Sequence, residues 1–115
     1  MSVRPEIHVL NDIEHWTAQA AALTLDVRRQ AVEQRGRFLI ALSGGRTPEQ
    51  VYRRLTSLSA TEQWRSTHFF FSDERCVPPD HPESNYRLAE QALFRPLTIP
   101  QDRIHRMRGE HPDPD

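Results

Sequence analysis

Two short polar stretches, each directly after an apolar run, hold the side chains best suited to chemistry. The first is Ser43-Gly44-Gly45-Arg46-Thr47, which follows the run 38–42. Its glycines let backbone N–H groups approach a ligand closely, and hydroxyls and a guanidinium stand beside them. A helix is expected to start immediately behind, so the stretch predicts an anion site. The alternative is a Gly-Gly turn that serves only tight packing.

The second polar stretch is Asp73-Glu74-Arg75, which follows the apolar run 68–72. Carboxylates can hold sugar hydroxyls, and a guanidinium can bind a phosphate or carboxylate oxygen. Taken alone, such a triplet is more often a local salt-bridge cluster that holds a loop. A ligand site is favoured here only because the stretch 43–47 is expected to lie beside it at the same edge of a sheet.

Other candidate centres are rejected. His81 and Cys76 lack the spaced partners that a metal site requires, so no metal is expected. The acidic and histidine-bearing end of the chain is expected to be a solvated tail; its members are His105, Glu110, His111, Asp113 and Asp115. All 15 basic residues are arginine, which excludes a Schiff-base lysine and a Walker-type phosphate lysine.

Helices and strands that would position these stretches are visible in the pattern of apolar residues. Strands are predicted over 7–10, 38–42, 68–72 and 104–107. A helix is predicted to begin at an Asn11 cap and to end at Gly36. Its expected core face holds Ile13, Trp16, Ala20, Leu23 and Val27.

Two further helices are predicted. One is expected to begin with Thr47 as the cap and Pro48 at the first helical position. It should bury Val51, Leu55 and Leu58. The other should begin at a Ser84 cap and end before Pro96. Trp16 and Trp64 are expected to be packing residues.

Strands and helices alternate in this order, which predicts a parallel sheet. The run 38–42 is continuously apolar, as in a strand that is covered on both faces. Both polar stretches then lie at the carboxyl edge of the sheet, where α/β proteins bind ligands. Ser43 and Asp73 are therefore predicted to lie close enough to touch one small ligand.

Composition excludes several classes of protein. The chain has 115 residues, 37% of them hydrophobic, and a formal net charge of −1, so neither disorder nor a nucleic-acid partner is indicated. No apolar run is long enough for a membrane span, and the N-terminus lacks the pattern of a secretory signal. One cysteine cannot form an internal disulfide, which favours the cytoplasm. A single domain over 1–115 is expected.

Three segments together resemble a known family. They are ALSGGRTPEQVYRRL, HFFFSDERCVPPDHPESNY and IPQDRIHRMRGE, in that order. They are similar to the 6-phosphogluconolactonases, which are related to the glucosamine-6-phosphate deaminases and isomerases. A deaminase is expected to have a tyrosine after the Asp-Glu pair and to lack Ser-Asn-Tyr. Arg75 and Ser84-Asn85-Tyr86 therefore favour the lactonase.

The resemblance implies a Rossmann-like three-layer αβα fold with a mostly parallel sheet, of which this chain is expected to be the N-terminal part. It implies hydrolysis of 6-phosphoglucono-1,5-lactone to 6-phosphogluconate, in the oxidative pentose phosphate pathway, with no metal and no cofactor. Ser43, Gly44, Gly45 and Thr47 would line the ligand site. Arg75 would meet a phosphate or carboxylate oxygen, and Asp73 would face the sugar or orient the base.

One departure from the family concerns the catalytic base. The resemblance implies a later Asp-Gly-His motif whose histidine activates water, and the chain stops at Asp115 before it. The isolated chain is therefore expected to be inactive, and to be unstable, dimeric or completed by the rest of the sheet. A deaminase or isomerase for amino-sugar phosphates, and a non-catalytic sugar-phosphate binder, remain as alternatives.

Overall fold

A computed structural model describes residues 12–112. Its main elements are helix α1 (Ile13–Arg35), strand β1 (Phe38–Leu42), helix α2 (Arg46–Leu58), strand β2 (Thr67–Phe71) and helix α3 (Asn85–Ala89). Single helical turns occur at Thr61–Trp64 and Gln101–Arg103, and α3 continues through a π-helical turn over Glu90–Phe94. The expected strand over 7–10 and the expected Asn11 cap lie outside the described residues. None of the described helices is long and apolar enough to cross a membrane.

Helix α1 begins and ends for local reasons. Asp12 caps it, because its side-chain oxygen accepts a hydrogen bond from the backbone N–H of His15 at 2.7 Å. Gly36 ends it in the left-handed conformation, with φ at 75°, and donates to the carbonyl of Val32. The predicted stop at Gly36 is confirmed.

The apolar face predicted for α1 is not its buried face. Helix α1 buries Thr17, Ala21 and Ala31 instead. The predicted residues Ile13, Trp16, Leu23 and Val27 are all more than two fifths exposed. Because Trp16 is 41% exposed, the prediction that it is a packing residue is wrong. The inner face of α1 carries small side chains in its place. Trp64, in contrast, is fully buried.

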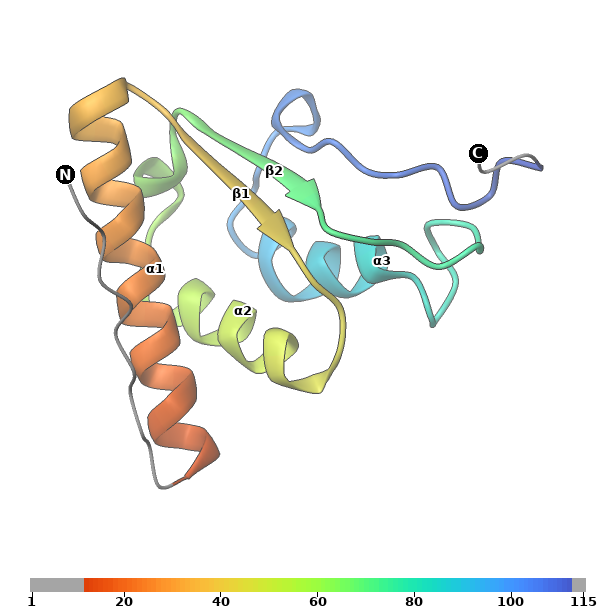
Figure 1. Ribbon diagram of the computed structural model, residues 1–115, viewed down its shortest axis with the longest axis horizontal. Coiled ribbons are helices and arrows are strands. Elements are labelled where there is room, and N and C mark those ends of the chain that lie inside the picture. Colours follow the sequence, from red (N-terminus) through yellow and green to blue (C-terminus); the bar gives the residue numbers. More distant parts are fainter. Residues whose placement is uncertain (1–11, 113–115) are drawn as a thin grey trace, which may run out of the picture.

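Strands β1 and β2 pair in parallel, with Phe38 opposite Thr67 and Leu42 opposite Phe71. Figure 1 shows both arrows pointing the same way, with α2 and α3 on one side of them. That side forms the core. It gathers Leu42, Tyr52, Leu55, Trp64, Phe69, Phe71, Leu93 and Phe94. Leu55 and Phe69 are almost completely buried, while Leu58 is 47% exposed, contrary to the prediction for it.

The other side of the sheet is open. Leu39 is 51% exposed and Phe70 is 39% exposed, and His68 is the cross-strand partner of Leu39. The expectation that β1 is covered on both faces is therefore wrong within the described residues. They form two layers of the expected αβα arrangement, helices on one face of a parallel pair of strands.

The predicted third strand at 104–107 is reduced to one parallel bridge, between Ile104 and Phe69. His105 donates its backbone N–H to the Phe69 carbonyl at 2.8 Å. The chain then leaves β2 and passes the loop after that strand. Gly109 approaches the Arg75 carbonyl so closely that a Cβ on it would lie 2.0 Å from that oxygen. Residues 105–108 form no further bridge with β2.

Candidate functional site at the carboxyl edge of the sheet

Both polar stretches lie at one edge of the sheet, as predicted. Ser72 follows β2 and donates its backbone N–H to the carbonyl of Leu42, the last residue of β1, at 2.9 Å. The hydroxyls of Ser43 and Ser72 are 3.1 Å apart. Parallel pairing forces this outcome, because strands that run the same way end at the same edge. The site that follows is built on these two strand ends.

The glycine stretch leads into α2 without a side-chain cap. Gly45 is the cap residue, with φ at 109°, a conformation that strongly favours glycine. The helix starts at Arg46, so the prediction of Thr47 as the cap and Pro48 at the first position is wrong. Proline fits at the third position equally well, because first-turn N–H groups have no partner inside the helix. The uncapped N–H groups leave this end of α2 suited to an anion.

Tyr52, for which no role was predicted, holds the start of the glycine stretch. Its hydroxyl donates to the Ser43 carbonyl at 2.5 Å and accepts from the Ser43 N–H at 2.9 Å. The side chain comes from α2 and is buried, and burial raises the pKa of Tyr52 to about 12. No local pattern in the sequence points to this role, because the contact joins residues nine positions apart across the turn between β1 and α2.

Glu74 serves the structure of the second stretch. Its carboxylate accepts four hydrogen bonds, from the backbone N–H groups of Arg75, Asn85 and Tyr86 and from the hydroxyl of Ser84. Burial alone would raise its pKa, but the backbone N–H groups and the Ser84 hydroxyl outweigh burial and lower that pKa. Glu74 thus anchors the loop to the first turn of α3. The salt-bridge cluster considered for this stretch is absent from the described residues, because Glu74 accepts from backbone N–H groups and the Ser84 hydroxyl and not from the Arg75 side chain.

Asp73 is the exposed carboxylate of the pair. Its Oδ1 accepts from Nδ2 of Asn85 at 3.3 Å and from the Ser72 hydroxyl at 3.5 Å. No hydrogen bond within residues 12–112 uses its Oδ2. Asp73 therefore keeps accepting capacity at the sheet edge, next to the glycine stretch.

Three more predicted residues flank this edge. Thr47 is half-buried in the first turn of α2, and Arg46 and Arg75 are exposed. Neither guanidinium forms an ion pair with a described residue. Both arginines are therefore available to an anion.

His68, His81 and His105 form no hydrogen bond with Ser43 or Asp73. His81 accepts from the Glu83 N–H through Nδ1 at 3.0 Å. His68 and His105 pair with each other at 2.9 Å on the open face of the sheet. Within the described residues no group of three or more potential metal ligands occurs.

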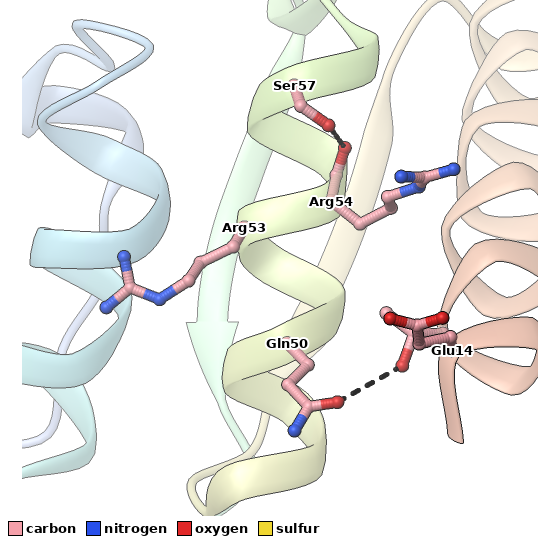
Figure 2. A pocket seen from close by; sticks show the side chains of 6 residues that line it. Glu14, Gln50, Arg53, Arg54 and Ser57 are labelled. Atoms are coloured by element: carbon pink, nitrogen blue, oxygen red, sulfur yellow. Dashed lines mark hydrogen bonds between the residues drawn. The ribbon is translucent and has the colours of Figure 1, made fainter. Parts of the chain in front are cut away.

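A separate groove of about 470 Å³ lies between α1 and α2. Figure 2 shows the side chains of Gln50 and Arg54 of α2 directed toward α1, which carries Glu14, while the Arg53 side chain points toward the other side of α2. Thr17 donates to Gln50 at a long 3.5 Å. None of the residues that line the groove belongs to the polar stretches after β1 and β2, so the groove is distinct from the site at the sheet edge.

Known proteins are similar to this chain in sequence and in fold. A family profile described as glucosamine-6-phosphate isomerases/6-phosphogluconolactonase matches residues 11–115. A 6-phosphogluconolactonase of Nostoc is 38% identical over 103 residues, which are 90% of this chain and 42% of the relative. One of Haemophilus influenzae is 45% identical over 74 residues, 63% of this chain and 32% of the relative.

Solved structures of 6-phosphogluconolactonases are also similar to this chain in fold. A 6-phosphogluconolactonase from Trypanosoma cruzi is 34% identical with a TM-score of 0.82, covering 95% of this chain and 41% of that one. The enzyme from Thermotoga maritima is 30% identical with a TM-score of 0.81, covering 91% of this chain and 46% of that one. The chain thus spans less than half the length of these relatives and carries part of their Rossmann-like α/β fold. It belongs to the family of glucosamine-6-phosphate isomerases and 6-phosphogluconolactonases.

Proposed function

We propose that this chain provides the phosphate-binding loop and the sugar-facing carboxylate of a 6-phosphogluconolactonase. The observation that carries the proposal is the uncapped N-terminus of α2, behind Gly44 and Gly45, next to the exposed Asp73. A sugar phosphate has an anionic end and several hydroxyls, and this edge offers N–H groups for the first and a carboxylate for the second. Sequence identities of 34–38% to lactonases support the same assignment.

Each predicted residue receives a role in this proposal. The N–H groups of the stretch 44–47 and the hydroxyls of Ser43 and Thr47 hold the phosphate, and Arg46 and Arg75 add charge. Asp73 accepts from the sugar hydroxyls or orients the general base. Tyr52 keeps the Ser43 backbone in place, and Glu74 keeps the second loop against α3.

The proposed reaction is hydrolysis of a cyclic ester. A general base takes a proton from water as its oxygen attacks the lactone carbonyl, and the ring oxygen leaves with a proton to give 6-phosphogluconate. Binding of the phosphate fixes the ring relative to that water. His15, His68, His81 and His105 form no hydrogen bond with Ser43 or Asp73. The resemblance to the lactonases implies a base histidine in a later Asp-Gly-His motif, and we assign the general base to that motif.

The substrate class and the setting belong to the same proposal. The partner is a small sugar phosphate, and no cofactor is required. The single Cys76 is exposed and unbonded, which supports a reducing cytoplasm.

The open face of the sheet is proposed to be covered by the rest of a family domain or by a second copy of the chain. Without such a cover the apolar side chains of Leu39 and Phe70 remain exposed to water.

A chimera tests this function. Residues 12–112 would replace the aligned segment of the Nostoc 6-phosphogluconolactonase, and turnover of 6-phosphoglucono-1,5-lactone and of glucosamine 6-phosphate would be compared. Lactone hydrolysis that falls at least about a hundredfold on Asp73→Ala is the expected result. Preferred turnover of glucosamine 6-phosphate would establish the deaminase alternative. A folded chimera that binds sugar phosphate but turns over neither substrate would favour a non-catalytic binder.

A further inference from the structure

Asn85 lies between the two polar stretches and touches both. It is the first residue of α3, and it is 7% exposed. Its backbone N–H donates to Glu74 at 2.6 Å, which ties its main chain to the second loop. The carboxamide is therefore held in a fixed place at the sheet edge.

One end of the carboxamide holds Asp73. Its Nδ2 donates to the backbone carbonyl of Asp73 at 3.2 Å and to the carboxylate Oδ1 at 3.3 Å. A single amide group therefore restrains both the main chain and the side chain of Asp73. An exposed carboxylate without such a partner would rotate freely among its rotamers.

The other end of the carboxamide lies against Gly44. A Cβ on Gly44 would lie 1.9 Å from Oδ1 of Asn85 and 2.5 Å from its Cγ. Gly44 is not among the described glycines with positive φ, which are Gly36 and Gly45. Its backbone would therefore accept alanine, and the space taken by Asn85 is what requires glycine here. Asn85 thus sets the separation of the two stretches.

We propose that Asn85 is a positioning residue that holds the Asp73 carboxylate beside the Gly44 backbone, where the sugar of a bound sugar phosphate meets it. The inference rests on the proposed function. Asparagine suits the task because it is neutral and donates toward the carboxylate. Aspartate has nearly the same shape, but when ionised it repels Asp73 and cannot donate.

The first test measures the contact itself, without any ligand. Unfolding equilibria of the 115-residue chain would be compared for the wild type, Gly44→Ala, Asn85→Ala and the double variant. Gly44→Ala should lower the folding constant by about tenfold or more in the native background and by less than about threefold beside Asn85→Ala, since truncation makes room for the methyl group. Equal losses in both backgrounds would overturn the proposal.

The second test separates positioning from structure. Amide NMR of the chain would follow titrations with 6-phosphogluconate and, separately, with inorganic phosphate. Asn85→Asp should weaken 6-phosphogluconate at least about fivefold but phosphate less than about twofold, because only the sugar needs Asp73. The matched control is Gln91→Glu, which likewise converts a carboxamide to a carboxylate, at an exposed position in the helical turn that continues α3.

Each outcome decides something. Equal weakening of both ligands would make Asn85 a purely structural residue, and no weakening of either would remove it from the site. If the wild-type chain binds 6-phosphogluconate no better than phosphate, the proposed sugar site fails. In that case Asn85 has no sugar to position Asp73 against, and this proposal falls with it, whatever the stability cycle shows.

Discussion

The hydroxyl of Tyr52 binds both backbone groups of Ser43, donating to its carbonyl and accepting from its N–H. One buried side chain thus replaces the pairing that Ser43 loses where β1 ends. The glycine stretch begins at a backbone position that α2 itself holds in place.

Tyr52→Phe tests this anchor. The ring still fills its place in the core, but the N–H and carbonyl of Ser43 lose their partner, at a cost of about 1–3 kcal/mol in the free energy of unfolding. Urea denaturation measures the loss. Broadened or shifted amide signals at 43–45 should accompany it, and an unchanged unfolding midpoint would show that water replaces the hydroxyl without cost. Tyr86→Phe is the matched control, because the Tyr86 hydroxyl has only a long 3.4 Å contact with Gln101.

Glu74 predicts a pH dependence of stability. Its pKa is lowered in the folded chain, so its contribution is complete above the ordinary carboxyl pKa of 4.5 and is lost as pH falls through the lower folded value. The free energy of unfolding should therefore decline below about pH 5 in the wild type and decline less steeply in Glu74→Gln. At pH 7 the variant should be less stable by about 1 kcal/mol, since the carboxylate is partly exposed. Parallel pH profiles of the two proteins would contradict this role.

Substitutions of Arg75 and of Glu74 are predicted to change different quantities, KM for Arg75 and the free energy of unfolding for Glu74. In the active chimera, Arg75→Ala should raise KM about tenfold or more with little change in stability, because its guanidinium has no described partner and is free to bind an anion. Glu74→Ala should lower the free energy of unfolding more than Arg75→Ala does, and should raise KM less than Arg75→Ala does. Steady-state kinetics and urea denaturation on the same samples separate the two. An unchanged KM in Arg75→Ala would reassign Arg75 to the structure of its loop.

The 115-residue chain by itself is predicted not to turn over the lactone above its spontaneous hydrolysis. His68, His81 and His105 bond to other groups and not to Ser43 or Asp73, and the base histidine that the resemblance implies belongs to a later motif. The assay needs confirmed intact mass and a control without protein. Turnover within tenfold of a typical rate of about 10 s⁻¹ would show that the chain carries its own base. His81, in the loop after Asp73, would then be the first residue to replace.

The open sheet face predicts self-association. Leu39 and Phe70 are large apolar side chains at 51% and 39% exposure, in diagonal positions on the paired strands, since Leu39 is opposite His68 and Phe70 is opposite Ala41. Sedimentation of the chain should show dimers or larger species that the double change Leu39→Ser and Phe70→Ser reduces. The same change to serine at Leu23 and Val27 tests the exposed face of α1 as the control surface. A monomer at all concentrations would exclude this use of the sheet face.

Sequence alone determined the local elements and the edge at which they meet. Strand β1, the stop at Gly36, the Ser84 cap and the shared position of Ser43 and Asp73 follow from apolar runs, capping residues and the rule that parallel strands end together. The three quoted segments also led to the family, because they combine loop residues whose types depend on their chemistry.

Tertiary structure decided which side chains hold that edge. Periodicity placed Ile13, Trp16, Leu23 and Val27 on a core face, yet in the folded chain α1 buries Thr17, Ala21 and Ala31 instead. Adjacent carboxylates in the sequence could not be told apart, but the N–H groups of α3 bind Glu74 and leave Asp73 exposed. The roles of Tyr52 and Asn85 depend on contacts with residues 9 and 12 positions away, which no local pattern records.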